Sequence, residues 1–318
     1  MTWRLLLALI GLSTTGISSF AQRPPGAEGL DSSRSSPQDA GFFSGTGVVR
    51  FELIQGRLSL DPLQHRKGSQ SVKEGDVYES ITVTARRGIP SMHYVCQDPS
   101  QHLTLSVQDG DSVRIESWMP EREKRAVIQH AADGNVTWEL THDESQQTVS
   151  QPTLLHLRQH DPAAFDLHFG DLIKRLLQGQ SLQSLCEQTH RAMLAETTRQ
   201  TVSFTATDVE RCVERLGAPR RQVRAQAEQQ LLAWGTPIIP FLKTYSPAEL
   251  DAEQTERVRY IRRRLRSGMR DTPSTLAKLL VNDTQYWSSI AQTLQADQRQ
   301  SASDHLQRVG FTASFVSP

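Results

Sequence analysis

The period of the apolar residues changes near residue 151, and this change constrains the fold more than any other feature. From Val48 onward, apolar and polar residues alternate in short runs that are separated by turn residues such as Asp109-Gly110 and Asp133-Gly134-Asn135. Alternation of this kind is typical of β-strands with one buried face. After Gln151 the period lengthens to about 3.6 residues, which is typical of amphipathic helices. The sequence therefore predicts an α+β chain of two domains, with antiparallel strands first and helices second.

The β domain is expected over residues 48–150, as an antiparallel β-sandwich or an open barrel. Its first two strands flank the turn Gln55-Gly56 in the stretch VVRFELIQGRLSL. The further predicted strands are VYESITVTARR, SMHYVCQ, LTLSV, SVRIESW, RAVIQH and NVTWELT.

The helical domain is expected over residues 151–318, and many of its helix starts carry a capping signal. A capping side chain precedes a proline at Asp161-Pro162, Thr236-Pro237, Ser246-Pro247 and Thr272-Pro273. The spacings Thr207 to Glu210 and Ser246 to Glu249 fit the capping box. These signals predict helices at 153–159, 162–177, 181–199, 207–216, 219–234, 237–244, 247–266, 273–281, 284–294 and 297–309.

The first 47 residues predict export followed by a flexible leader. MTWR and LLLALIGL give a charged start and a short apolar core, and Ser19-Phe20-Ala21 fits a cleavage site before Gln22. We interpret residues 1–21 as a signal peptide and expect a periplasmic or secreted protein; an uncleaved anchor or a buried helix is the alternative. Residues 22–47 are rich in Pro, Ser and Gly, so we expect a leader with too little apolar surface to fold.

The cysteine count argues against a disulfide scaffold. The chain has three cysteines, Cys96, Cys186 and Cys212, and an odd number cannot pair fully within one chain. One bridge with one free thiol is possible, but three buried thiols are the favoured interpretation.

A sequence repeat occurs inside the helical domain. RAQAEQQLLAWG at 224–235 aligns without gaps with RQSASDHLQRVG at 299–310, and each copy follows a shorter amphipathic helix. The matched positions are Arg224 and Arg299, Ala227 and Ala302, Leu231 and Leu306, Trp234 and Val309, and Gly235 and Gly310. A recurring helix pair is typical of an α-solenoid, so the apolar stripe of each copy is predicted to be a helix–helix interface.

The stretch VERCVERLGAPRRQVRAQAEQQLLAWGTPIIPFLK resembles a HEAT-like helical repeat, over residues 207–266 and, more loosely, 284–310. The resemblance implies binding or scaffolding through protein–protein contacts rather than catalysis. This chain departs from such arrays in having only two or three units, where three or more are usual. No family resemblance is found for the β domain.

An arginine-rich segment follows the first repeat. RVRYIRRRLRSGMR at 257–270 contains seven arginines and no acid. Arg259, Arg262, Arg263 and Arg266 are the predicted contact ridge for a partner, which we expect to be another protein or an anionic envelope polymer. Nucleic acid is disfavoured because the 35 basic residues balance the 35 acidic residues and because export is predicted.

Metal and enzyme signals are weak. His156 and His160 share one helical face, as do Cys186 and His190, but zinc sites need three or four ligands. The sequence contains no G-x-S-x-G, G-x-x-x-x-G-K-[ST], G-x-G-x-x-G or C-x-x-C motif, so neither a metal nor a cofactor is expected. The predicted function is an exported, non-catalytic binding or scaffold protein. The alternatives are an envelope hydrolase or carbohydrate-active enzyme with its site on the β domain, and a self-associating structural component.

Overall fold

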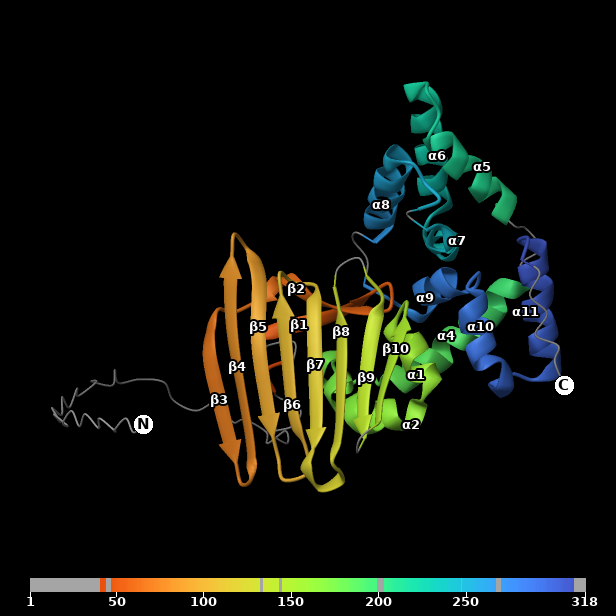
Figure 1. The fold of residues 1–318 in the computed structure, drawn as a ribbon. Helices are drawn as coiled ribbons and strands as arrows, with labels where there is room; N and C mark the ends of the chain where they lie inside the picture. The colour runs from red at the N-terminus through yellow and green to blue at the C-terminus, as the bar shows by residue number, and fades with distance from the viewer. Residues whose placement is uncertain are drawn as a thin grey trace, which may run out of the picture. The chain divides into compact units, whose positions relative to one another are not determined.

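The computed structural model describes residues 41–43, 47–131, 134–142, 145–198, 203–246, 248–266 and 270–311. All of them belong to one compact unit, residues 37–318 (Figure 1). The predicted signal peptide and most of the predicted leader lie outside the described residues. The α+β class is confirmed: strands fill the first half of the described chain and helices the second.

The strands form one large antiparallel sheet and one separate hairpin. The large sheet has eight strands in the order β10-β9-β8-β7-β6-β5-β4-β3, so each strand pairs with its neighbours in the chain. Its strands are β3 (Gly68–Glu74), β4 (Val77–Arg86), β5 (Ile89–Gln97), β6 (His102–Gln108), β7 (Ser112–Met119), β8 (Lys124–His130), β9 (Val136–His142) and β10 (Ser145–Gln151). The hairpin consists of β1 (Val49–Ile54) and β2 (Arg57–His65).

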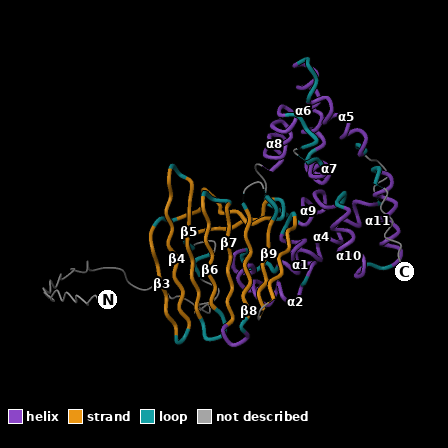
Figure 2. Tube along the Cα trace, in the orientation of Figure 1, coloured by secondary structure: helices purple, strands orange, loops and turns teal. Residues whose placement is uncertain are grey.

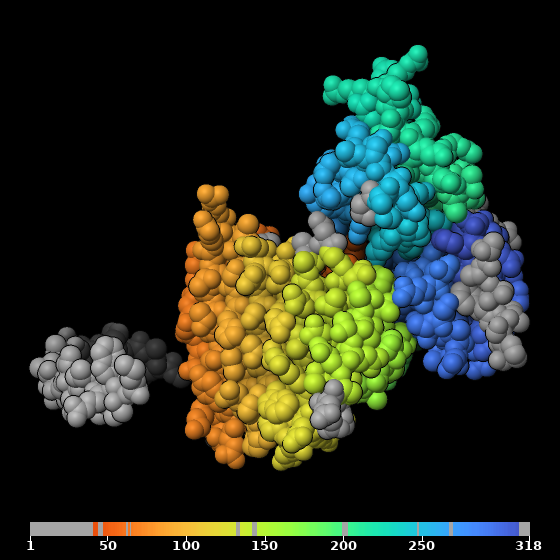
Figure 3. Space-filling model, in the orientation of Figure 1, coloured from red at the N-terminus to blue at the C-terminus, as the bar shows by residue number. Residues whose placement is uncertain are grey.

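One face of the large sheet is apolar from β4 to β9. The alternation found in the sequence places a row of directly paired residues on this face. The row runs Ile81, Tyr94, Leu105, Ile115, Ile128 and Trp138. All six side chains are buried, whereas many residues between them in the chain point to a polar face that Figure 3 shows free of helices.

The β1–β2 hairpin and the first helices cover the apolar face. Leu60 of β2 donates its backbone N–H to the carbonyl of Gly110 at 2.8 Å. Phe165 packs edge-on against Trp138, with the ring centroids 5.9 Å apart. Ser117 of β7 hydrogen-bonds His168 at 2.9 Å. Sheet and helices therefore share one continuous core.

All ten predicted helices are confirmed as helical segments (Figure 2). They correspond to eleven α-helices of the described chain: α1 (Leu154–His160), α2 (Pro162–Phe165), α3 (Asp171–Leu176), α4 (Leu182–Thr197), α5 (Ala206–Leu216), α6 (Arg221–Trp234), α7 (Ile239–Thr244), α8 (Ala252–Arg266), α9 (Pro273–Leu280), α10 (Thr284–Ile290) and α11 (Ala296–Arg308). The predicted helix 162–177 is divided by a π-helical turn at Asp166–Gly170.

Three predicted helix starts are wrong. Thr236 does not cap a helix: it is the first residue of a 3-10 turn, Thr236–Ile238, whose N-cap is Gly235. The capping box of α5 is formed by Thr205 and Asp208, not by Thr207 and Glu210. The Ser246 N–H donates to the Glu249 carboxylate, but α8 begins only at Ala252, where Asp251 and Gln254 hydrogen-bond each other's backbone N–H. For α5 and α8 the sequence offers a capping pair at more than one register, and packing selects the register that buries the apolar side of the helix.

The apolar stripe of α6 is an interface between helices. Ala227 and Leu231 are buried, and α6 packs against α5 and α8. In the second copy Ala302 and Leu306 are buried as well, but α11 packs mainly against α4 rather than against the helix before it. The buried alanine and leucine match in the two copies, but Val309 is buried where Trp234 is half-buried, and the helix partners differ.

Residues 41–43 of the predicted leader are folded rather than solvated. Phe43 is 2% exposed and packs edge-on against Tyr94, with the ring centroids 4.9 Å apart. Two adjacent aromatic residues, Phe42 and Phe43, supply the apolar area that the rest of the leader sequence lacks. The three cysteines are free and buried, as the favoured interpretation of their number predicts.

Candidate functional site

Helix α8 divides the predicted arginine ridge into two pairs. Val258 and Ile261 are buried, so they fix which side of α8 faces the core. Arg262 and Arg266 are half-buried and line a cavity. Arg259 and Arg263 are exposed, and Arg259 forms an ion pair with Glu256 one turn earlier. These four arginines are therefore not equivalent: Arg262 and Arg266 line the cavity, whereas Arg259 and Arg263 do not.

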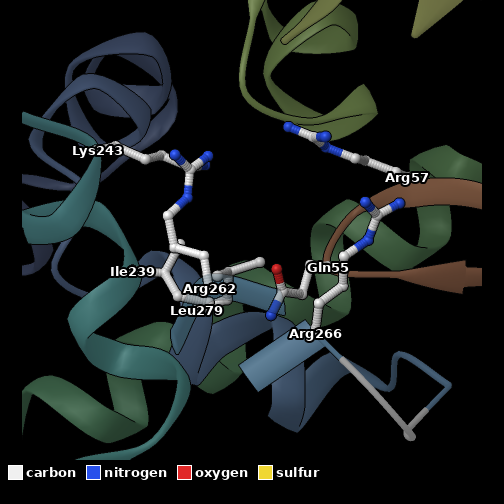
Figure 4. Close-up of a pocket in the computed structure, with 7 residues that line it drawn as sticks. All are labelled: Gln55, Arg57, Ile239, Lys243, Arg262, Arg266 and Leu279. Carbon is white, nitrogen blue, oxygen red and sulfur yellow. The ribbon is translucent and has the colours of Figure 1, made fainter. Parts of the chain in front are cut away.

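The cavity is lined by side chains from four separate segments of the chain. We call it the cationic cavity, and its described lining residues are Gln55, Arg57, Ile239, Lys243, Arg262, Arg266 and Leu279. Four of these seven carry a positive charge and none carries a negative one. Figure 4 shows the cationic side chains entering the same space from β2, α7 and α8. The volume of about 30 Å³ holds roughly two water molecules.

Arg57 is the most buried of the four cations. Its side chain is only 7% exposed, and its Nε donates to the carbonyl oxygen of Pro152 at 3.2 Å. A guanidinium held in this way loses little further side-chain entropy when it binds an anion. Arg57 therefore provides a fixed charge at the wall of the cavity.

Burial is the main cause of the lowered pKa of Lys243. It lowers the pKa of this ammonium group to about 8; Asp283 acts in the opposite direction, and Arg57 and Arg262 each add a smaller lowering. Like charges disfavour each other's ionised forms most strongly where water is excluded. An anion in the cavity would relieve this repulsion.

Two carboxyl groups near the cavity already have partners. Asp271 accepts the backbone N–H of Gly56 at 2.6 Å, and burial raises its pKa to about 7 despite this hydrogen bond. Burial also opposes ionisation of Asp283, but its interactions with His156 and the backbone of Tyr286 outweigh burial and lower its pKa. Neither carboxyl group lines the cavity, so neither occupies the space that an anionic ligand would fill.

The turn between β1 and β2 places Gln55 and Arg57 next to the helices that form the rest of the cavity lining. Gln55 and Gly56 both have positive φ, 51° and 71°, which is typical of a tight hairpin turn. Gln55 Nε2 donates to the Leu265 carbonyl at 3.0 Å, and the Gly56 carbonyl accepts the N–H of Leu154 at 2.9 Å. The sequence predicts this turn, but it gives no signal that the turn docks onto α8 and α1.

The weak metal candidates do not form a metal site. His156 is 2% exposed and is held between Thr153 Oγ1 at 2.9 Å and Asp283 at 3.4 Å, whereas His160 is exposed at the end of the helix. His190 hydrogen-bonds the Tyr286 hydroxyl at 2.8 Å. Within the described ranges, no group of three or more His, Cys, Asp or Glu side chains is placed to hold a metal ion.

Two of the repeat arginines have the same structural role. Arg224 donates to the carbonyls of Ala218 and Pro219, at 2.8 and 2.9 Å, just after α5 ends. Arg299 donates to the carbonyls of Ala291 and Leu294, at 3.4 and 3.1 Å, just after α10 ends. Each arginine thereby ties its helix to the segment that connects it with the preceding helix. These two arginines are structural and do not reach the cavity.

The sequence analysis missed Arg57, Lys243 and Gln55 as site residues. They lie in ordinary amphipathic segments, and no short motif connects them with the arginines of α8. Comparison with family models, with curated proteins and with solved structures gave no match. None of the helices in the described part of the chain has the length and apolar character needed to cross a membrane.

Proposed function

We propose that this protein is an exported, non-catalytic binding protein that recognises an anionic group of its partner through the cationic cavity. The partner is another protein or an anionic envelope polymer. The HEAT-like helices act as the scaffold that positions α7 and α8. The proposal rests on one observation above all: four cationic side chains from β2, α7 and α8 converge on one small cavity with no acid among its described lining residues.

The repeat pattern supports the scaffold part of the proposal. Ala227 and Ala302 are buried at equivalent positions, and Arg224 and Arg299 each donate to carbonyls of the segment that precedes their helix. Helix pairs of this kind commonly present binding surfaces. Because α11 packs mainly against α4 and not against the helix before it, the array is a short one.

The cavity also supports binding rather than hydrolysis. Acid–base hydrolysis uses carboxyl groups with separated pKa values that face a substrate. Here Asp271 and Asp283 do have pKa values shifted in opposite directions, but their oxygens bind backbone N–H groups and His156. Both carboxyl groups therefore stabilise the walls of the cavity.

The test compares two double variants of α8 that remove the same charge. Arg262→Gln with Arg266→Gln changes the cavity, and Arg259→Gln with Arg263→Gln changes the exposed side of the same helix. Glutamine keeps the helix propensity close to that of arginine. Crosslinking in cells, followed by capture of the protein, should yield a specific partner with the wild type and the exposed-side variant but not with the cavity variant. A partner that survives the cavity changes would contradict the proposal.

Self-association is a second candidate because of the edge strand β3. All seven of its residues are exposed, and Val72 is 54% exposed. An exposed edge strand is a template for pairing with another chain, although Lys73 opposes such pairing. Sedimentation over a wide concentration range tests this candidate: a dimer that dissociates on Val72→Lys supports it, and a monomer at every concentration rejects it.

A further inference from the structure

The solvent face of the large sheet carries an ordered row of exposed side chains. The strand register pairs one residue from each of six successive strands, β3 to β8, directly across the sheet, and all six residues are exposed. We call them the outer row: Lys73, Tyr78, Gln97, His102, Trp118 and Arg125. On β4 to β8 each member lies three residues from the buried residue of its own strand, so it points to the opposite face. Figure 3 shows this face free of helices.

The outer row has the same kind of side chain at corresponding places from its two ends. Lys73 and Arg125 are the end members, and each is paired with an aromatic residue, Tyr78 or Trp118. Two polar side chains lie between the aromatic residues. Neighbouring strands are about 4.8 Å apart, so the aromatic residues are separated by about 14 Å and the two cations by about 24 Å.

The middle of the outer row has the chemistry that binds sugar rings. Tyr78 and Trp118 are 39% and 36% exposed on an otherwise polar face, where each offers a flat apolar ring with a polar tip. Within the described part of the chain, the side chains of Tyr78, Gln97 and Trp118 have no hydrogen-bond partner. A pyranose ring presents C–H groups on its face and hydroxyl groups at its rim. It therefore matches both the exposed rings and the polar groups between them.

The charges on this face select the kind of polymer. Lys73 forms no ion pair with the described residues, and Arg125 shares one guanidinium nitrogen with Glu116 at 2.5 Å. A single-stranded nucleic acid has a phosphate at every nucleotide and needs a continuous positive groove. Here no arginine or lysine lies between the two end members of the outer row, and Glu116 and Glu139 lie on the same face. Two separated cations match a chain with separated negative charges, such as an acidic polysaccharide.

We propose that the outer row binds an acidic polysaccharide, with Tyr78 and Trp118 stacked on sugar rings and with Lys73 and Arg125 bound to carboxylate groups of the polymer. Antiparallel sheets twist, so the bound chain must turn from strand to strand. Rotatable glycosidic bonds allow this, whereas a rigid crystalline polymer surface does not. None of the outer-row residues lines the cationic cavity. The inference therefore goes beyond the proposed function and does not depend on it.

Affinity electrophoresis of the full-length chain in native gels tests the proposal. The acidic polymers are carboxymethyl cellulose, polygalacturonate and hyaluronan. Hydroxyethyl cellulose is the neutral control, because it has the same glucan backbone as carboxymethyl cellulose without the carboxylates. We expect the acidic polymers to retard the wild type and the neutral polymer to retard it much less.

Two pairs of variants separate the aromatic contribution from the charge. Tyr78→Ala/Trp118→Ala should lose about tenfold or more in affinity, whereas Tyr78→Phe/Trp118→Phe keeps the rings and should retain most of it. Tyr260→Ala removes an aromatic residue of α8 that is 41% exposed, and it should bind as the wild type does. Lys73→Gln should weaken binding about twofold to fivefold. Lys174→Gln, which removes an exposed charge from α3, should leave binding unchanged.

The contrary results are equally specific. Equal retardation by carboxymethyl cellulose and hydroxyethyl cellulose overturns the assignment of an acidic polymer. Retardation that persists in Tyr78→Ala/Trp118→Ala overturns the outer row as the site. Tighter binding of single-stranded oligothymidylate than of every polysaccharide identifies a nucleic-acid surface instead, and retardation by none of the three acidic polymers overturns the proposal. Circular dichroism and thermal unfolding verify that each variant is folded.

Discussion

Replacement of Gly56 by alanine tests how the hairpin is docked onto the helices. Gly56 has a φ of 71°, and a Cβ added there would lie 2.6 Å from Thr153 Cβ and 2.8 Å from its Cγ2. Thr153 is 1% exposed and caps α1 by accepting the N–H of His156. It therefore cannot move aside without disturbing the start of α1.

The expected loss of stability has two parts. The left-handed conformation costs a non-glycine residue about 1–2 kcal/mol. Overpacking against a buried neighbour costs about a further 1–3 kcal/mol. Together they predict that Gly56→Ala lowers the free energy of unfolding by about 2–5 kcal/mol.

Gly75→Ala is the matched control for the conformational part. Gly75 has a φ of 57° in the turn between β3 and β4, and no atom lies within 4 Å of its added Cβ. Only the conformational cost applies there, so we expect a loss of about 1–2 kcal/mol. Urea unfolding followed by circular dichroism and by tryptophan fluorescence measures both variants. Equal losses for Gly56→Ala and Gly75→Ala would refute the argument that the turn is wedged against Thr153.

Three further predictions concern pH, thiols and processing. Burial lowers the pKa of His130, with Arg57 and Arg266 lowering it further, and burial likewise lowers that of His305; both reach about 4 against 6.5 when unfolded. The stability present above pH 6.5 should therefore fall as the pH drops towards 4, by about 2 kcal/mol per histidine at pH 5, and His305→Gln should lessen the fall seen in acid unfolding. The three buried thiols should react with a thiol reagent only after the protein is denatured, and rapid reaction in the native state would contradict their burial. If the predicted signal peptide is removed, N-terminal sequencing of the protein purified from its host should begin at Gln22, and a start at Met1 would show that the apolar segment is retained.

The sequence by itself determined the elements of this protein through local periodicity. The strands β4 to β9 and all ten predicted helical segments follow from residues that alternate or recur on one face. Strands β3 and β10 were missed because their sequences, GSQSVKE and SQQTVSQ, carry almost no apolar signal. β3 is held by backbone pairing with β4, and β10 by backbone pairing with β9. The residue pattern within one strand does not report its pairing with another strand.

Only the tertiary structure decided which residues form the site. Arg262 and Arg266 could be proposed from sequence because they lie together on α8, but Arg57 and Lys243 lie far from them in the chain. The turn at Gly56 brings these residues to one cavity through hydrogen bonds to Asp271 and Leu154. Local periodicity reports which face of an element is buried, but it does not report which other element buries it. The charges that meet at a site therefore become visible only once the packing is known.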